Sequence, residues 1–192
     1  MTQVQHAGGA WDAPQSRPVK GQLIRDFTLN STLGQPVSLS DYRGRSNLVL
    51  VFCGDGSIPS DFGTLTEIEG TLTEIEKDYP TFQDEQTQVL AILQCQPQEA
   101  TRIQQQSQLS FPLLVDVDGQ IHRSVGAADG RGRPVAAIYI TDQFGEVFAA
   151  YRAADGETMP SVEMIVKVIR FINIQCPECG HPEWPAEASM LR

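Results

Sequence analysis

The sequence of 192 residues lacks any long hydrophobic run, and its N-terminus lacks the pattern of a secretion signal. The longest unbroken apolar runs, at residues 48–53 and 135–140, fall far short of the ~20 residues that a membrane-spanning helix needs. The N-terminal residues have neither a basic start nor an apolar core. We therefore expect no membrane partner and a cytoplasmic location, in which thiols stay reduced.

Positive charge is also scarce, because 14 Lys and Arg residues face 24 Asp and Glu residues and give a formal net charge of −10. Such a field repels phosphate backbones and anionic lipid headgroups, which argues against nucleic acid and membrane surfaces as partners. A chain of this length buries enough surface to fold without disulfides or metal. Its four cysteines are therefore expected to be thiols or metal ligands.

Residues 22–175 are predicted to form one α/β domain, between a flexible N-terminal arm (residues 1–21) and a C-terminal tail (residues 176–192). The arm contains glycine, proline and polar residues without an apolar period. In the domain, the runs NLVLVF and VLAIL predict buried strands, and a segment with helical spacing follows each of them. This βαβ pattern indicates a parallel pair of strands.

The second half of the domain predicts an antiparallel hairpin and a closing helix. The runs VAAIYIT and GEVFAAYR are separated by DQFG, where polar residues and a glycine favour a turn. Apolar residues between about Pro160 and Gln175 recur at helical spacing, and Pro160 suits the first turn of a helix. We expect this helix to cover one face of the sheet.

An internal repeat, TLTEIEG at residues 64–70 followed by TLTEIEK at residues 71–77, predicts an amphipathic helix of two heptads. Its apolar stripe either faces the core of its own domain or pairs with a helix of a partner. Because two heptads are short for a coiled coil, we favour a stripe that faces the core.

Three segments resemble the opening of the peroxiredoxin family, within the thioredoxin superfamily: Phe27-Thr-Leu, GQPVSLSDYRGR from Gly34, and LVLVF from Leu48. With the βαβ unit, the hairpin and the terminal helix, the resemblance covers about residues 22–185. It implies a thioredoxin-like α/β fold, with a mixed central β-sheet flanked by helices. It also implies antioxidant redox chemistry at the point where the LVLVF strand meets the next helix. In the first turn of such a helix, the helix dipole lowers a thiol pKa and favours the reactive thiolate.

The sequence departs from the family pattern at two positions. When the family's Thr-Pro-x-Cys motif is aligned, Asp61 occupies the place of the peroxidatic cysteine. The family's arginine, six positions before Asp142, falls on Ala136. Arg131 and Arg133 lie just upstream, and either replace that cation or are simple surface charges. The resemblance therefore predicts the fold, whereas it does not predict peroxidase activity.

Two cysteines follow the predicted strands of the βαβ unit. Cys53 ends the LVLVF strand and is the thiol nearest to the vacated position, so it is either a substitute nucleophile or a small core residue. We favour the core interpretation. Cys95 follows the VLAIL strand, and parallel pairing of the strands would bring their ends about 4.8 Å apart. A functional disulfide between the two is the less favoured interpretation, because buried free thiols are common.

The tail contains the strongest local motif, Cys176-Pro-Glu-Cys179-Gly-His181. Its C-x-x-C spacing is typical of dithiol oxidoreductases, in which one thiolate attacks and its neighbour resolves the mixed disulfide. The tail is also similar to the C-terminal arm of two-cysteine peroxiredoxins, which carries a resolving cysteine. The position after a helix and beside Glu178 opposes high thiol reactivity.

The same motif is similar to the metal-binding knuckle of zinc ribbons, in which two thiolates bind one ion. His181 would be a third ligand beside Cys176 and Cys179, and His122, another cysteine or a second subunit would complete the set. A third possibility is that the tail only packs, with Trp184 supplying apolar area. These interpretations stay open at the level of sequence.

We therefore predict a thiol-dependent oxidoreductase of peroxiredoxin-like type that acts through Cys176 and Cys179, with Cys53 as the less favoured nucleophile. Its expected partners are a thiol reductant and a disulfide or hydroperoxide substrate, and it needs no cofactor. The alternative is a non-catalytic thioredoxin-fold module with a structural zinc or docking element at the tail. A zinc ion shared between two knuckles would make a homodimer.

Overall fold

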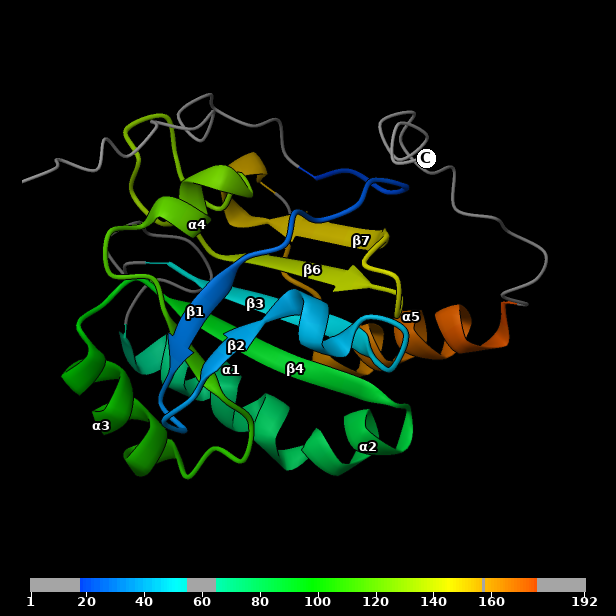
Figure 1. Ribbon diagram of the computed structural model, residues 1–192, viewed down its shortest axis with the longest axis horizontal. Coiled ribbons are helices and arrows are strands. Elements are labelled where there is room, and N and C mark those ends of the chain that lie inside the picture. The colour runs from blue at the N-terminus through cyan, green and yellow to red at the C-terminus, as the bar shows by residue number, and fades with distance from the viewer. Residues whose placement is uncertain (1–17, 55–64, 157, 176–192) are drawn as a thin grey trace, which may run out of the picture.

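A computed structural model describes residues 18–54, 65–156 and 158–175, with the side chains of residues 65–70 and 154 left out. The described residues form a seven-stranded mixed sheet in the order β2-β1-β5-β4-β3-β6-β7, with helices on both faces (Figure 1). None of the helices in this part of the chain is long and apolar enough to cross a membrane. The predicted class, a mixed central sheet flanked by helices, is confirmed.

The centre of the sheet is parallel and its flanks are antiparallel. β3 runs parallel to β4, and β4 runs parallel to β5, whereas β6 is antiparallel to β3 and to β7. Both the predicted parallel pair and the predicted hairpin are therefore confirmed. The strands are β1 (Thr28–Ser31), β2 (Pro36–Ser38), β3 (Asn47–Cys53), β4 (Thr87–Leu93), β5 (Leu113–Val115), β6 (Ala137–Thr141) and β7 (Val147–Arg152).

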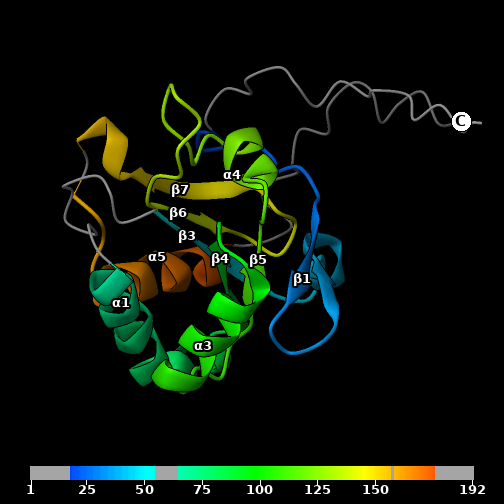
Figure 2. The same ribbon diagram turned by 90° about the vertical axis from the view of Figure 1, so that its left-hand side faces the viewer.

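The helices divide between the two faces of the sheet, as Figure 2 shows. Side chains of α1, α2, α3 and α5 form one core cluster, and α4 lies over the opposite face. Successive residues of β3 alternate between the two clusters, as the two-residue period of a strand requires. The helical segments are η1 (Leu39–Tyr42), α1 (Leu65–Lys77), α2 (Tyr79–Asp84), α3 (Pro97–Ser107), α4 (Gln120–Ser124), η2 (Ala153–Asp155) and α5 (Val162–Ile174).

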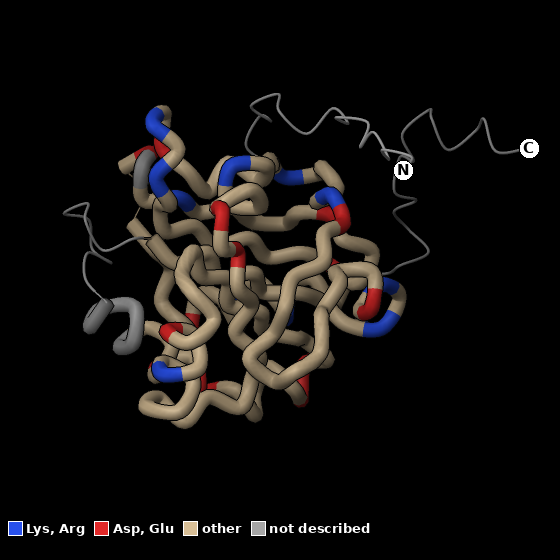
Figure 3. The backbone as a smooth tube through the Cα atoms, turned by 60° about the vertical axis from the view of Figure 1, so that its left-hand side comes forward, with Lys and Arg blue, Asp and Glu red and all other residues tan. Residues whose placement is uncertain are grey.

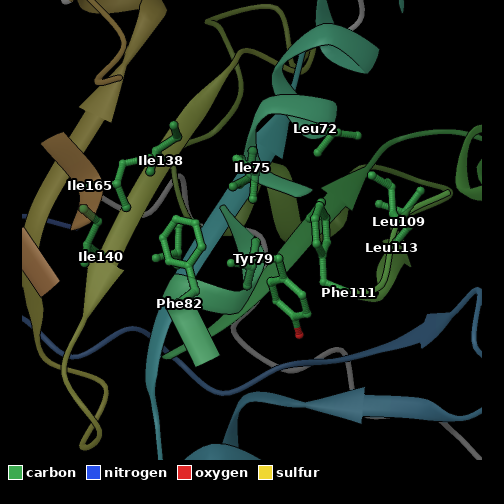
Figure 4. Close-up of a cluster of buried hydrophobic side chains, with 14 of the residues drawn as sticks. Leu72, Ile75, Tyr79, Phe82, Leu109, Phe111, Leu113, Ile138, Ile140 and Ile165 are labelled. Atoms are coloured by element: carbon green, nitrogen blue, oxygen red, sulfur yellow. The ribbon is translucent and has the colours of Figure 1, made fainter. Parts of the chain in front are cut away.

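The heptad repeat forms α1, and the described part of its apolar stripe faces the core. Leu72 and Ile75 have 0% and 1% of their surface exposed. They pack with aromatic side chains of α2 and of the segment before β5, including Phe82 and Phe111 (Figure 4). For these two residues, the interpretation as a core-facing stripe is confirmed.

The closing helix begins two residues later than the sequence suggests. The side-chain oxygen of Ser161 accepts a hydrogen bond from the backbone N–H of Met164 at 3.3 Å, so Ser161 is the N-cap of α5. Pro160 therefore precedes the helix and does not belong to its first turn. The expectation for Pro160 was wrong because a serine cap satisfies a free N–H group at the helix start, and proline alone offers no such acceptor.

Candidate active site

The carboxyl ends of the parallel strands meet at one edge of the sheet. Cys53 at the end of β3 pairs in register with Leu93, and Leu93 pairs with Val115 at the end of β5. The residue after β5, Asp116, donates its backbone N–H to the carbonyl oxygen of Leu93 at 2.9 Å. This carboxyl edge therefore gathers the segments that follow three strands, and it is the place where the sequence predicts thiol chemistry.

Cys53 is a buried thiol at this edge. It is 6% exposed and belongs to the core cluster beneath α1 and α5. Burial, with a smaller contribution from the neighbouring Cys95, raises the pKa of Cys53 to about 12. The thiol therefore stays protonated at neutral pH, which makes Cys53 a poor nucleophile and favours its interpretation as a core residue.

A small apolar pocket lies beside Cys53, where the family resemblance places an arginine. Ala136 lines this pocket together with Cys53, Leu72 and Met159. Ala136 is 7% exposed, and its methyl side chain brings no charge to the pocket. The position that would supply the cation in the family pattern is therefore apolar in this protein.

Arg131 and Arg133 do not replace that cation, because both belong to an exposed loop organised around Asp129. One carboxylate oxygen of Asp129 accepts the backbone N–H groups of both arginines at 2.9 Å, and the other accepts Nε of Arg133 at 2.9 Å. The backbone N–H of Arg133, then its guanidinium and the N–H of Arg131, lower the pKa of Asp129 to about 2. Acidic and basic residues are interspersed along the described chain (Figure 3).

Cys95 lies in the bend between β4 and α3 and is half-buried. Burial and the nearby Glu99 raise the pKa of Cys95, and a hydrogen bond from the backbone N–H of Ala100 lowers it in part. Its side chain packs against the same core cluster as Cys53, and both cysteines are free thiols.

Asp116 and His122 form a buried pair at the same edge, which the sequence analysis did not predict. One carboxylate oxygen of Asp116 lies 2.7 Å from Nδ1 of His122 and accepts the backbone N–H of His122 at 2.8 Å. Burial acts to raise the pKa of Asp116, but hydrogen bonds from His122 and from the N–H of Ile121, with the charge of His122, outweigh it and lower the pKa. Asp116 is therefore a carboxylate, and Nδ1 of His122 donates to it.

The imidazole of His122 is enclosed on all sides. Its exposed fraction is 0%, and its ring meets Phe52 of β3 edge to face, with ring centroids 5.2 Å apart. Nε2 of His122 has no hydrogen-bond partner among the residues that the structure describes. His122 lies in α4, whose N-cap Gly119 has a φ of 67°.

The described residues provide no ready-made metal site. In residues 18–54, 65–156 and 158–175, no group of three or more His, Cys, Asp or Glu side chains could hold a metal ion. Nδ1 of His122 is bound to Asp116, and Nε2, which has no partner among the described residues, is enclosed with a ring that is 0% exposed. Cys176, Cys179 and His181 lie outside the described residues, as does Asp61. Their predicted roles stay predictions.

A mixed sheet with a βαβ unit, a hairpin and a closing helix, and with thiols at the carboxyl edge, defines a thioredoxin-like protein. Solved structures support this class. *Mycobacterium tuberculosis* AhpC has a TM-score of 0.68 at 16% identity, covering 86% of this chain and 100% of that one. *Enterococcus faecalis* AhpC has a TM-score of 0.67 at 18% identity, covering 88% and 99%. Peroxidoxin BcpB from *Mycobacterium tuberculosis* has a TM-score of 0.66 at 17% identity, covering 83% and 100%.

The family follows from the sequence match. Residues 20–150 match the model of the AhpC/TSA family, so the chain belongs to this family. The predicted resemblance to peroxiredoxins is thereby confirmed. No curated protein matches this chain significantly. The structural neighbours share less than a fifth of their residues with it, and therefore support the fold alone.

Proposed function

We propose that this protein is a thiol-dependent oxidoreductase of peroxiredoxin-like type that uses Cys176 and Cys179 as its reactive dithiol. Membership of the AhpC/TSA family supports thiol chemistry. The observation that carries the choice of cysteines is the raised pKa of both Cys53 and Cys95, which keeps these thiols protonated near neutral pH. Fast chemistry at neutral pH is therefore assigned to the C-x-x-C pair of the tail.

In the proposed reaction, one thiolate of the pair attacks a disulfide or hydroperoxide, and the second thiol resolves the product into an internal disulfide. With a disulfide substrate, both substrate sulfurs leave as thiols. With a hydroperoxide, the O–O bond breaks, and an alcohol and water are released. A thiol reductant, available in the cytoplasm where we propose that the protein acts, then restores the dithiol.

Counting free thiols tests this proposal. The full chain is titrated at neutral pH with hydrogen peroxide and, separately, with an oxidised dithiol. We expect a fast phase that consumes two of the four thiols and is abolished in Cys176→Ser and in Cys179→Ser. Cys53→Ser is the matched control and should leave the fast phase unchanged. Absence of a fast phase in the unmodified chain would contradict the proposal.

A second candidate is a non-catalytic thioredoxin-fold module whose tail binds structural zinc or docks a partner. The apolar Ala136 at the family's arginine position favours it, because the carboxyl edge lacks that cation. Zinc-bound thiolates are poor redox centres, so the two candidates largely exclude each other.

Elemental analysis of protein purified without chelator separates the candidates. About one zinc per chain would indicate a site completed by His181 and a further side chain, and about half would indicate a homodimer that shares one ion. Zinc-free protein with a fast thiol phase would support the oxidoreductase.

A further inference from the structure

Cys53 and Cys95 lie on the same face of the sheet at its carboxyl edge. Cys53 pairs in register with Leu93 in the parallel ladder of β3 and β4. Cys95 follows Leu93 by two residues, in the bend between β4 and α3. The core packing places both on one face of the sheet, since Cys53 belongs to the cluster beneath α1 and α5 and Cys95 packs against that cluster.

The two thiols are also close enough to interact electrostatically. After burial, the charge of Cys95 is the next cause that raises the pKa of Cys53. The two differ in access, because Cys53 is 6% exposed whereas Cys95 is half-buried in the bend before α3. A small oxidant therefore reaches Cys95 first.

We propose that Cys53 and Cys95 form a redox-sensitive dithiol that a hydroperoxide converts into a disulfide across the carboxyl edge. In the first step the Cys95 thiolate attacks the hydroperoxide. The O–O bond breaks, water or an alcohol leaves, and Cys95 becomes a sulfenic acid. In the second step the Cys53 sulfur attacks the sulfenic sulfur, the S–S bond forms, and water leaves with the Cys53 proton. A dithiol reductant reverses the change by thiol–disulfide exchange.

Formation of this bond requires a small movement of the chain after β4. A disulfide needs its Cα atoms within about 7 Å of each other. A two-residue offset between neighbouring parallel strands corresponds to about 8 Å. Residues 94 and 95 belong to neither β4 nor α3, so they can close the difference without breaking the β3–β4 ladder.

Oxidation would join the end of β3 to the start of α3 and so fix the geometry of the carboxyl edge. This pair is separate from Cys176 and Cys179, and the inference does not depend on the activity proposed for them. Because both thiols of the edge pair are protonated near neutral pH, it responds to sustained oxidant and not to a single fast turnover.

The test uses the full chain carrying Cys176→Ser and Cys179→Ser, so that Cys53 and Cys95 are its two cysteines. This variant is incubated with hydrogen peroxide, alkylated and measured by intact mass. We expect the oxidised variant to take up no alkylating agent and to have a mass two hydrogen atoms below that of the reduced, unalkylated variant. A dithiol reductant should restore both the mass and the two alkylation sites. Retention of both thiols, or oxygen added to Cys95 with Cys53 still free, would overturn the proposal.

Two further measurements keep the test decisive. Adding Cys53→Ser to the same variant is the matched control, and Cys95 should then gain oxygen without losing hydrogen. Peptide mapping of the oxidised unmodified chain should yield a linked Cys53–Cys95 peptide, and this measurement does not depend on whether the variant folds. A map that contains only a Cys176–Cys179 link would overturn the proposal and leave the proposed function standing.

The pH dependence gives an independent check. Below the pKa of the attacking thiol, the thiolate fraction rises about tenfold per pH unit. We expect the rate of Cys53–Cys95 disulfide formation to rise by about this factor from pH 7 to pH 8. A rate that is constant over this range would contradict attack by the small thiolate fraction of a mostly protonated thiol.

Discussion

At the scale of single residues, Cys53 and Asp116 are both nearly inaccessible and lie at the same edge, yet their pKa values shift in opposite directions. Burial disfavours the charged form of each group. For Cys53 the neighbouring Cys95 adds to that effect, and the pKa rises to about 12. For Asp116 the hydrogen bonds from His122 and Ile121 exceed it, and the pKa falls. The partners of a buried group therefore decide its charge.

This contrast predicts that Asp116 contributes strongly to stability. Asp116→Ala would leave Nδ1 and the backbone N–H of His122 buried without an acceptor, at a cost of about 3 kcal/mol. Asp116→Asn is the matched control, since its amide oxygen still accepts one of these hydrogen bonds. This variant should therefore lose less unfolding free energy. Urea unfolding measures both losses. Equal and small losses of unfolding free energy in the two variants would show that the Asp116–His122 pair does not stabilise the fold.

The lowered pKa of Asp116 also predicts how its contribution depends on pH. The folded-state pKa lies below the ordinary value of 3.8, so the stabilisation is fully present above that value and is lost as pH falls through the folded pKa. The difference in unfolding free energy between the unmodified chain and Asp116→Asn should be constant from about pH 5 upward and should shrink below about pH 4. A difference that grows as the solution is acidified would contradict this sign.

At the scale of secondary-structure elements, long regular patterns could be predicted from the sequence and short ones could not. All seven residues of β3 are buried, and a continuous apolar run is what a strand covered on both faces requires. β1 and β2 contain four and three residues of mixed exposure, too few for a period to emerge. Of their pairings, only that of β1 with β5 joins residues far apart in the chain, since Asn30 lies opposite Val115.

The burial of the α1 stripe predicts different effects for neighbouring substitutions. Ile75→Ala removes a side chain that is 1% exposed, and should cost about 3 kcal/mol through lost burial and the cavity left behind. Glu74→Ala, on the exposed side of the same helix, should change stability by less than about 0.5 kcal/mol. Thermal and urea unfolding measure the stability of the two variants against the unmodified chain. If Ile75→Ala changed only the mass in solution, the stripe would be a partner interface.

The turn before α4 predicts that a side chain at Gly119 destabilises the protein. A residue with a side chain would be strained at its φ of 67°, and an added Cβ would lie 2.5 Å from Oε1 of Gln94. Gly119→Ala should therefore destabilise the protein by about 1–2 kcal/mol. The matched control is Gly130→Ala, since nothing lies within 4 Å of a Cβ added there. Equal unfolding midpoints for the two variants would contradict the account.

At the scale of the whole molecule, the candidate site was predicted only in part, because its residues are brought together by the sheet. The sequence placed thiol chemistry at the end of β3, and it identified Ala136 as a departure from the family. It did not connect Asp116 with His122, since neither residue belongs to a recognised motif and α4 brings them together. It raised a contact between Cys53 and Cys95 from the expected parallel pairing, but it could not fix the register of the two strands, which is set by packing across the sheet.

The apolar carboxyl edge predicts how the fold would respond to a restored peroxidatic cysteine. Asp61→Cys places a thiol at the family's reactive position, but Ala136 supplies no positive charge to stabilise a thiolate. We expect little peroxidase activity from Asp61→Cys alone. A second substitution, Ala136→Arg, should raise the rate of hydrogen peroxide consumption about tenfold, since lowering a thiol pKa by one unit increases the thiolate fraction by this factor.

Ala136→Met, combined with Asp61→Cys, is the control for this comparison, because methionine fills the pocket without adding charge. It should leave the rate unchanged, and circular dichroism should confirm that each variant keeps its fold, since burying a guanidinium carries its own cost. If Asp61→Cys alone reached the rate of the double variant, another group at the edge would have to stabilise the thiolate. Peroxidase chemistry at the family's usual position would then depend on residue 61 alone.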